Sequence, residues 1–141
     1  MKEVWKRWSP TIFNESMHKA CYAVVKDTEE LEFNLVFNDT DDIVKIVFQY
    51  GVLSYQNTDE GKRLRAINYL VDNYDDDFYG DWTLFEVEKS SFLNWFQEEN
   101  YGIYQDDEIK HLVLLTSNDV VDILTDYEPK VSIVEHEVEK L

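Results

Sequence analysis

Apolar and polar residues alternate through the first third of the chain, and this alternation predicts a sheet. Residues 31–37 place Leu, Phe, Leu and Phe at every second position, with polar Glu32 and Asn34 between them, which is the period of a half-buried strand. Apolar runs at 20–25 and 43–50 flank this segment across polar connectors of four or five residues. Because a parallel crossover needs a dozen or more residues, these connectors predict three neighbouring antiparallel strands.

The hydrophobic period changes in the middle of the chain. Gly51 is expected to break or bend the third strand before the segment 52–55. Apolar residues then recur every three or four positions, which predicts a helix over about 58–74. Asn57, with Glu60 three residues later, predicts a capping box at the start of this helix.

The remaining pattern predicts one more helix between strands. Residues 82–87 have the composition of a strand, and Ser90 or Ser91 then caps a second helix that ends before Gly102. The large apolar residues of this helix are expected to pack inward: Phe92, Leu93, Trp95 and Phe96.

A hairpin is predicted near the end of the chain. Apolar runs at 109–116 and 120–124 are separated by the turn residues 117–119, which tolerate unusual backbone angles. Pro129 ends the regular pattern, and 130–134 is expected to add an edge strand. The fold class is therefore α+β, a mainly antiparallel sheet of five to seven strands with two helices packed on one face.

Length and composition indicate a folded domain. The 141 residues contain no linker or repeat and form one predicted domain, 1–141, with the charged segments 1–18 and 135–141 at its periphery. Four Trp, nine Tyr and eight Phe, with 44% hydrophobic residues, exclude the composition of a disordered chain. The N-terminus lacks the apolar stretch of a signal peptide and no run of 18 apolar residues occurs, so a cytoplasmic protein is expected.

Charge narrows the choice of partner. Thirty acidic and 13 basic residues leave a formal net charge of −17, and residues 1–26 are locally basic, which leaves −20 on the remainder. Such a polyanion repels phosphate backbones and anionic lipid, so direct nucleic-acid binding and membrane docking are not expected. A basic protein would be attracted over a long range. The simpler alternative is that acidity only keeps the protein in solution.

The residues needed for common catalytic and cofactor sites are missing. The four glycines are isolated, which excludes a dinucleotide fingerprint and a P-loop, and the three histidines lie far apart, so no zinc or other metal site is expected. His111 lies within a predicted strand and is expected to be half-buried and hydrogen-bonded to a neighbour. We expect no cofactor, no catalytic residue and no enzymatic activity. A small hydrolase with a pocket that joins a histidine to a carboxylate is the remaining enzymatic alternative.

One acidic stretch combines aromatic and charged residues. Over 74–82 the aspartates are interleaved with Tyr74, Tyr79 and Trp82, which are expected to present aromatic anchors ringed by negative charge, a composition suited to binding a basic protein. The same stretch has most of a calcium-binding loop counted from Asp75, but Tyr79 stands at a ligand position and a predicted strand replaces the exiting helix. Two further acidic groups lie before predicted strands. The candidate partner-binding residues are Asp39, Asp41, Asp42, Tyr74, Asp75, Asp76, Asp77, Tyr79, Asp81, Asp106 and Asp107.

The pattern of aromatic and apolar positions over residues 80–130 resembles a known family. It comprises the strand at 82–87, the segment 90–96 with the acidic pair and glycine that follow it, and the hairpin strands at 111–116 and 120–124. These segments resemble small acidic immunity proteins, or antitoxins, encoded beside polymorphic toxins of Gram-positive bacteria, in particular partners of LXG-type toxins. The resemblance implies a cytoplasmic protein that occludes the active site of its own strain's toxin, often a nuclease. It implies no catalytic residue.

Resemblance and charge lead to one hypothesis. A nuclease must bind phosphate and therefore tends to present a basic cleft, which a domain of charge −17 would find by electrostatic steering. We therefore expect an immunity protein that binds a basic toxin domain. The alternative is an acidic regulatory or DNA-mimic protein that blocks a nucleic-acid-binding host protein.

Overall fold

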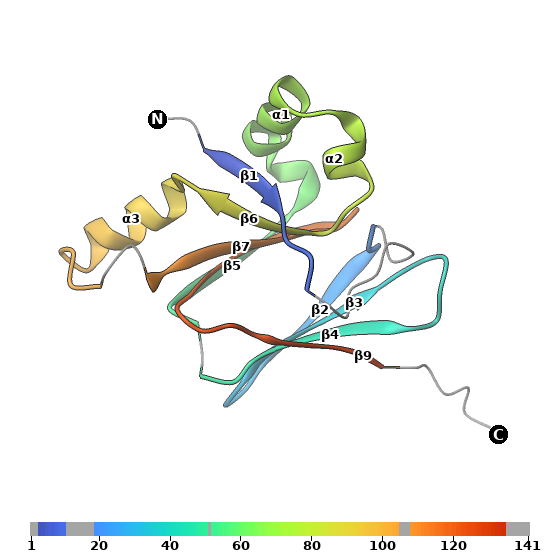
Figure 1. Cartoon of the computed structure of the whole chain (residues 1–141), viewed down its shortest axis with the longest axis horizontal. Coiled ribbons are helices and arrows are strands. Elements are labelled where there is room, and N and C mark those ends of the chain that lie inside the picture. Colours follow the sequence, from blue (N-terminus) through green and yellow to red (C-terminus); the bar gives the residue numbers. More distant parts are fainter. Residues whose placement is uncertain (1–2, 11–18, 51, 105–107, 135–141) are drawn as a thin grey trace.

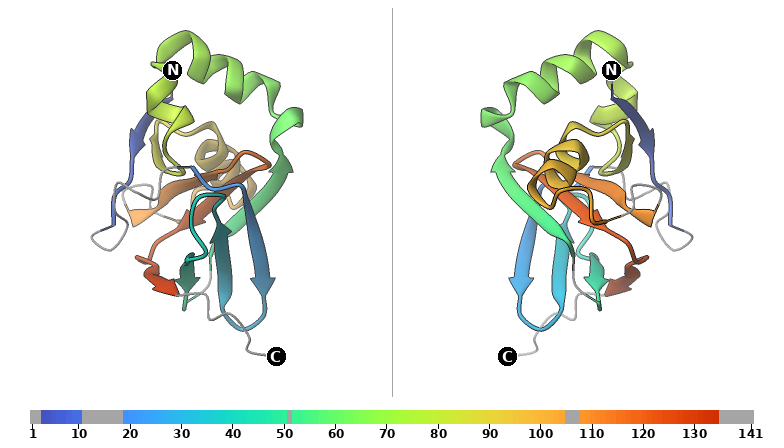
Figure 2. Two further views of the ribbon diagram at one scale, coloured as in Figure 1. Left: turned by 90° about the vertical axis from the view of Figure 1, so that its right-hand side faces the viewer. Right: turned by 90° about the vertical axis from the view of Figure 1, so that its left-hand side faces the viewer.

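The structure, a computed structural model, describes residues 3–10, 19–50, 52–104 and 108–134. Its described strands form two antiparallel sheets that pack face to face, and helices cover the outer face of the larger sheet (Figures 1 and 2). The strands are β1 (Val4–Arg7), β2 (Tyr22–Asp27), β3 (Leu31–Val36), β4 (Ile43–Phe48), β5 (Ser54–Asp59), β6 (Leu84–Glu88), β7 (Lys110–Leu115), β8 (Asp119–Thr125) and β9 (Lys130–Val134). The predicted α+β class is confirmed, with nine described strands in two sheets where the sequence indicated five to seven in one.

The smaller sheet has the strand order β2-β3-β4-β9. The predicted meander is confirmed, because β3 pairs antiparallel with both β2 and β4. The predicted edge strand at 130–134 is also confirmed, since β9 pairs with the outer side of β4. Short polar connectors between strands of opposite direction produce this arrangement.

The larger sheet has the strand order β1-β6-β7-β8-β5. The predicted hairpin is confirmed as β7 and β8, which pair from Lys110 opposite Thr125 to Leu115 opposite Val120. The edge strand β1 was not predicted, and the segment containing it was placed at the periphery. Trp5 of β1 lies opposite Val87 and is only 4% exposed, so this part of the N-terminal segment belongs to the core.

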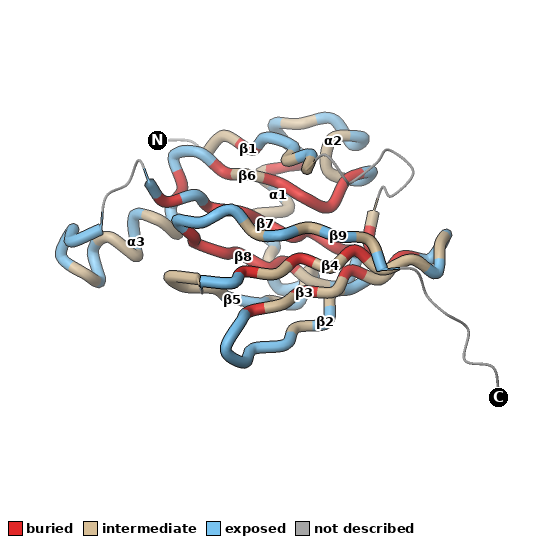
Figure 3. Tube along the Cα trace, turned by 60° about the horizontal axis from the view of Figure 1, so that its bottom comes forward, coloured by how far each residue is buried: buried red, intermediate tan, exposed pale blue. Residues whose placement is uncertain are grey.

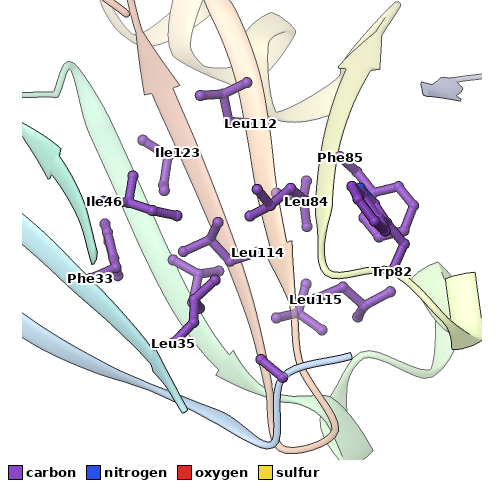
Figure 4. Packing of buried hydrophobic residues seen from close by; sticks show 14 of the residues in the cluster. Phe33, Leu35, Ile46, Trp82, Leu84, Phe85, Leu112, Leu114, Leu115 and Ile123 are labelled. Atoms are coloured by element: carbon purple, nitrogen blue, oxygen red, sulfur yellow. The ribbon is translucent and has the colours of Figure 1, made fainter. Parts of the chain in front are cut away.

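The main hydrophobic core lies between the two sheets. Alternate side chains of β3 and β4 point toward alternate side chains of β7 and β8, as Figure 4 shows for Phe33, Ile46, Leu114 and Ile123. Each of these four side chains is fully buried. The period of two that indicated strands in the sequence is therefore the pattern that fills this core.

Three helices in the described part of the chain cover the opposite face of the larger sheet: α1 (Leu64–Asn73), α2 (Asp76–Gly80) and α3 (Ser91–Glu99). Leu70 of α1 is fully buried, Phe78 of α2 packs on Phe85 of β6, and Phe92 of α3 packs edge-on against His111 of β7. The prediction of helices on one face is confirmed. The short helix α2 was not predicted.

The first helix begins later than the sequence suggested. Residues 54–59 extend as β5, and Asn57 lies opposite Val121 of β8, so the capping box predicted at Asn57 is wrong. A single turn of 3₁₀ helix, Glu60–Lys62, follows, and the Asp59 side chain accepts a hydrogen bond from the Gly61 amide at its start. Pairing with a central strand satisfies the backbone of residues 54–59 better than an early helical turn.

The second helix is capped as predicted, but not all of it packs inward. Ser90 Oγ accepts the Leu93 amide at 3.0 Å. The helix ends at Glu99, and Trp95, predicted to be buried, is 48% exposed. No described helix is long and apolar enough to cross a membrane.

Candidate functional site

The acidic stretch at 74–82 forms α2 and its flanking residues. Asp75, Asp76, Asp77 and Asp81 are all exposed, so their carboxylates can contribute to an external field. Acidic residues in the first turn of a helix also interact favourably with its positive end. This placement is compatible with the predicted partner-binding role, which stays a prediction.

The aromatic residues of that stretch do not serve as exposed anchors. Tyr74 stacks on Phe78 with 4.6 Å between ring centroids, and its hydroxyl accepts the Trp5 amide at 2.8 Å. Tyr79 is partly buried and donates its hydroxyl to Asp76 at 3.0 Å, and Trp82 is only 6% exposed. The expectation that aromatic side chains project between the α2 carboxylates is therefore wrong, because they pack against the sheet.

Two basic side chains fix α2 from its carboxyl end. Arg7 donates to the carbonyl oxygens of Asp77 and Phe78, and its guanidinium lies 5.7 Å from the centre of the Phe78 ring. Lys19 Nζ donates to the carbonyl oxygens of Tyr79 at 2.6 Å and Trp82 at 3.0 Å. Burial lowers the pKa of Lys19 to about 7. These contacts hold the acidic turn of α2 in one position.

The other predicted acidic groups lie elsewhere in the fold. Asp39, Asp41 and Asp42 belong to the connection between β3 and β4, on the right in Figure 1, where Asp39 and Asp41 are exposed and Asp42 is half-buried. Asp106 and Asp107 lie outside the described residues. The adjacent Glu108 is exposed and precedes β7, whose first residues lie at the opposite, left-hand end of the molecule.

A buried polar network crosses the helix-covered face of the larger sheet. His111 of β7 lies between two partners, with Nδ1 2.6 Å from Ser90 Oγ and Nε2 2.8 Å from Asp122 Oδ1 of β8. Asp122 Oδ2 also accepts from Arg63 at 2.5 Å and from Gln56 at 3.2 Å. The predicted hydrogen bonding of His111 to a neighbour is confirmed, and its burial is more complete than expected, at 4% exposed.

The network keeps Asp122 ionised in spite of its burial. Desolvation alone would raise the pKa of this carboxyl, but the hydrogen bond and charge of His111, with the charge of Arg63, hold that pKa below its usual range. Because Arg63 precedes α1 and Ser90 precedes α3, the network joins the beginnings of both helices to the two central strands. The sequence indicated only the histidine, since partners distant in the chain give no local pattern.

Two neighbouring cavities open beside this network. One of about 170 Å³ is lined by His111 and Asp122, and one of about 490 Å³ is lined by Tyr69 and Arg65. Both also share a set of lining residues: Glu3, Gln56, Arg63 and Ser91. A histidine and a carboxylate therefore do meet at a pocket, as the hydrolase alternative requires.

The chemistry of these groups favours a structural role. Ser90 is only 3% exposed, and its Oγ accepts a hydrogen bond from the Leu93 amide and lies 2.6 Å from His111 Nδ1. The Nε2 atom of the same ring is hydrogen-bonded to Asp122, so both ring nitrogens have partners within the protein. Ser91 does line both cavities, but its hydroxyl donates to Glu3 at 3.0 Å. Because Ser90 is buried at the start of α3, the hydroxyl beside His111 is not open to a substrate.

Neither metal-ligating side chains nor comparisons with known proteins assign a function to this site. Among the described residues no group of three or more His, Cys, Asp or Glu side chains is placed to hold a metal ion. Comparisons with protein-family models, with curated proteins and with solved structures find no match to this chain.

Proposed function

We propose that this chain is a cytoplasmic immunity protein that binds a basic toxin domain, with a nuclease as the best-fitting class, and blocks its active site. The observation that carries the proposal is that the acidic groups are exposed, whereas the groups that could do acid–base chemistry are buried. Acidic side chains at α2 and in the β3–β4 connection lie exposed, while Ser90, His111 and Asp122 are buried and hydrogen-bonded to one another. A net charge of −17 suits rapid capture of a cationic surface.

Co-expression with the protein encoded immediately upstream tests this function. We expect a stoichiometric complex in pull-down experiments, restored growth of cells that express the upstream protein, and affinity that falls steeply between about 50 and 500 mM salt. Absence of both binding and growth rescue would refute the proposal. A complex that forms equally well at high salt would refute its electrostatic mechanism.

Neutralising the α2 acids should slow capture. In the triple variant Asp75→Asn, Asp76→Asn, Asp77→Asn, we expect association with that toxin domain to be about 3- to 10-fold slower at low salt, with a flatter salt dependence. Stopped-flow fluorescence measures both quantities.

A matched control removes the same number of charges elsewhere. Glu29, Glu30 and Asp126 are exposed in connections at the edge of the molecule away from α2 (Figure 1), so Glu29→Gln, Glu30→Gln, Asp126→Asn should change the rate less. Equal slowing in both triple variants would show that only net charge matters. Unchanged kinetics in the α2 variant would remove α2 from the steering surface.

A further inference from the structure

The end of α3 and the turn after it expose a group of large apolar side chains. We define the α3 surface by Trp95, Tyr101, Ile103 and Tyr104, which are 48%, 93%, 75% and 46% exposed. Figure 1 shows α3 at the left-hand edge of the molecule, and Figure 3 shows exposed backbone at its tip. Tyr101, Ile103 and Tyr104 lie within four consecutive residues, and exposed apolar groups that gather in this way are typical of interaction sites.

The turn holds these side chains outward in a defined conformation. Tyr101 has φ of 60° and Gly102 has φ of 73°, so two consecutive residues lie in the left-handed region. Such a conformation is unfavourable for a tyrosine and is retained where the surroundings impose it. The Gly102 amide donates to Gln97 O at 2.9 Å, and the Ile103 amide donates to Asn100 Oδ1 at 3.0 Å. These bonds fix the backbone at Tyr101 and so the direction in which its side chain leaves the chain.

Aromatic stacking supports the rest of the surface. Trp95 stacks on Phe92 with 5.6 Å between centroids, and Tyr104 packs on Phe96 at the same distance. Phe92 in turn contacts His111, which connects the surface to the buried network. Rigid aromatic groups cost little conformational entropy on binding and are enriched among the residues that dominate binding energy.

Charge identifies the kind of partner. Between Lys89 and Lys110 the sequence contains five acidic residues and no basic one, and Glu98 and Glu99 are exposed at the end of α3. A second copy of this chain would bring a like net charge of −17 to the same surface. A complementary partner therefore has an apolar pocket with lysine or arginine at its rim.

We propose that the α3 surface is the anchor that docks into the basic toxin domain, with Tyr101 and Ile103 entering an apolar pocket and Glu98 and Glu99 meeting its basic rim. This inference rests on the proposed function. It separates two roles: the acids of α2 and of the β3–β4 connection increase the rate of encounter, and the α3 surface supplies most of the lifetime of the complex.

The test compares two double variants in binding to the toxin domain encoded upstream. Tyr101→Asn with Ile103→Ser removes both apolar groups, and asparagine tolerates the left-handed conformation at 101, so the fold should be retained. We expect the dissociation constant, measured by calorimetry, to rise at least about 100-fold. The control, Tyr50→Asn with Leu64→Ser, removes a tyrosine and an aliphatic residue that are 74% and 67% exposed elsewhere, and it should change affinity less than about threefold.

Each outcome bears on a different proposal. If the wild-type chain does not bind the toxin domain, the proposed function fails, and this inference fails with it. If the wild type binds and the Tyr101/Ile103 variant binds equally well, only the α3 anchor is refuted. If sedimentation shows a wild-type dimer that this variant converts to a monomer, the surface is covered by a second copy and the inference is overturned.

Discussion

Replacing Asp122 with alanine should destabilise the protein by about 3–5 kcal/mol, because it leaves the Arg63 guanidinium partly buried without its carboxylate and removes the hydrogen-bond partner of His111 Nε2. For a domain of this size that loss corresponds to a fall in Tm of about 10–20 °C. Thermal denaturation followed by circular dichroism measures it.

Two further variants show whether the loss of stability comes from breaking the buried network or only from removing one negative charge. Asp126→Ala removes an exposed carboxylate just after β8 and should shift stability by less than about 0.5 kcal/mol. Combining Asp122→Ala with Arg63→Met removes both charges, and its cost should be smaller than the sum of the single variants. A loss below about 1 kcal/mol in Asp122→Ala would show that the network does not hold the two central strands.

The contribution of Asp122 should also depend on pH. Since the folded pKa of this carboxyl is lower than its ordinary value of 3.8, the folded state binds fewer protons than the unfolded state between the two pKa values. The stabilisation is thus present above the ordinary value and is lost as pH falls through the folded pKa. The Asp122→Ala variant lacks this part of the acid sensitivity.

Local periodicity predicted most of the fold. Residues 31–37 alternate so regularly that the strand and its buried face follow directly from sterics, and β3 buries Leu31, Phe33 and Leu35 as the pattern requires. Short connectors predicted antiparallel neighbours, and the pair Ser90 and Ser91 predicted the start of α3, where Ser90 is the residue whose hydroxyl accepts the capping hydrogen bond.

The sequence did not predict features that depend on distant pairing. Val4–Arg7 is short and lies among charged residues, and only its pairing with β6 makes it a strand. The division into two sheets depends on which hairpins pair, which no local pattern encodes. The Ser90, His111 and Asp122 contacts join three segments through the fold.

The aromatic residues expected at the partner-binding surface also show that local sequence pattern does not predict which side chains the fold will cover. Composition indicated aromatic groups among acids at 74–82, but those rings pack against the sheet because α2 lies on Phe85. The combination of exposed aromatic side chains and acids occurs at α3, where the helical period predicted burial of Trp95. Periodicity identifies an apolar stripe, but it does not reveal whether the sheet is wide enough to cover the whole stripe.

Replacing Phe33 with alanine should cost about 3–5 kcal/mol, because its ring fills the space between the two sheets. Phe33 is fully buried on β3, edge-on to Phe48 in its own sheet at 6.0 Å and to Tyr55 of the larger sheet at 6.1 Å. Alanine would leave a cavity bounded by both sheets, and neither can collapse into it without losing register. Urea denaturation should show a lower midpoint with an unchanged slope.

The control variant Val24→Ala lies on the solvent face of the neighbouring strand β2, where Val24 is 43% exposed, and it should lose less than about 1 kcal/mol. Equal losses in the two variants would contradict the face-to-face packing, since only Phe33 reaches the second sheet.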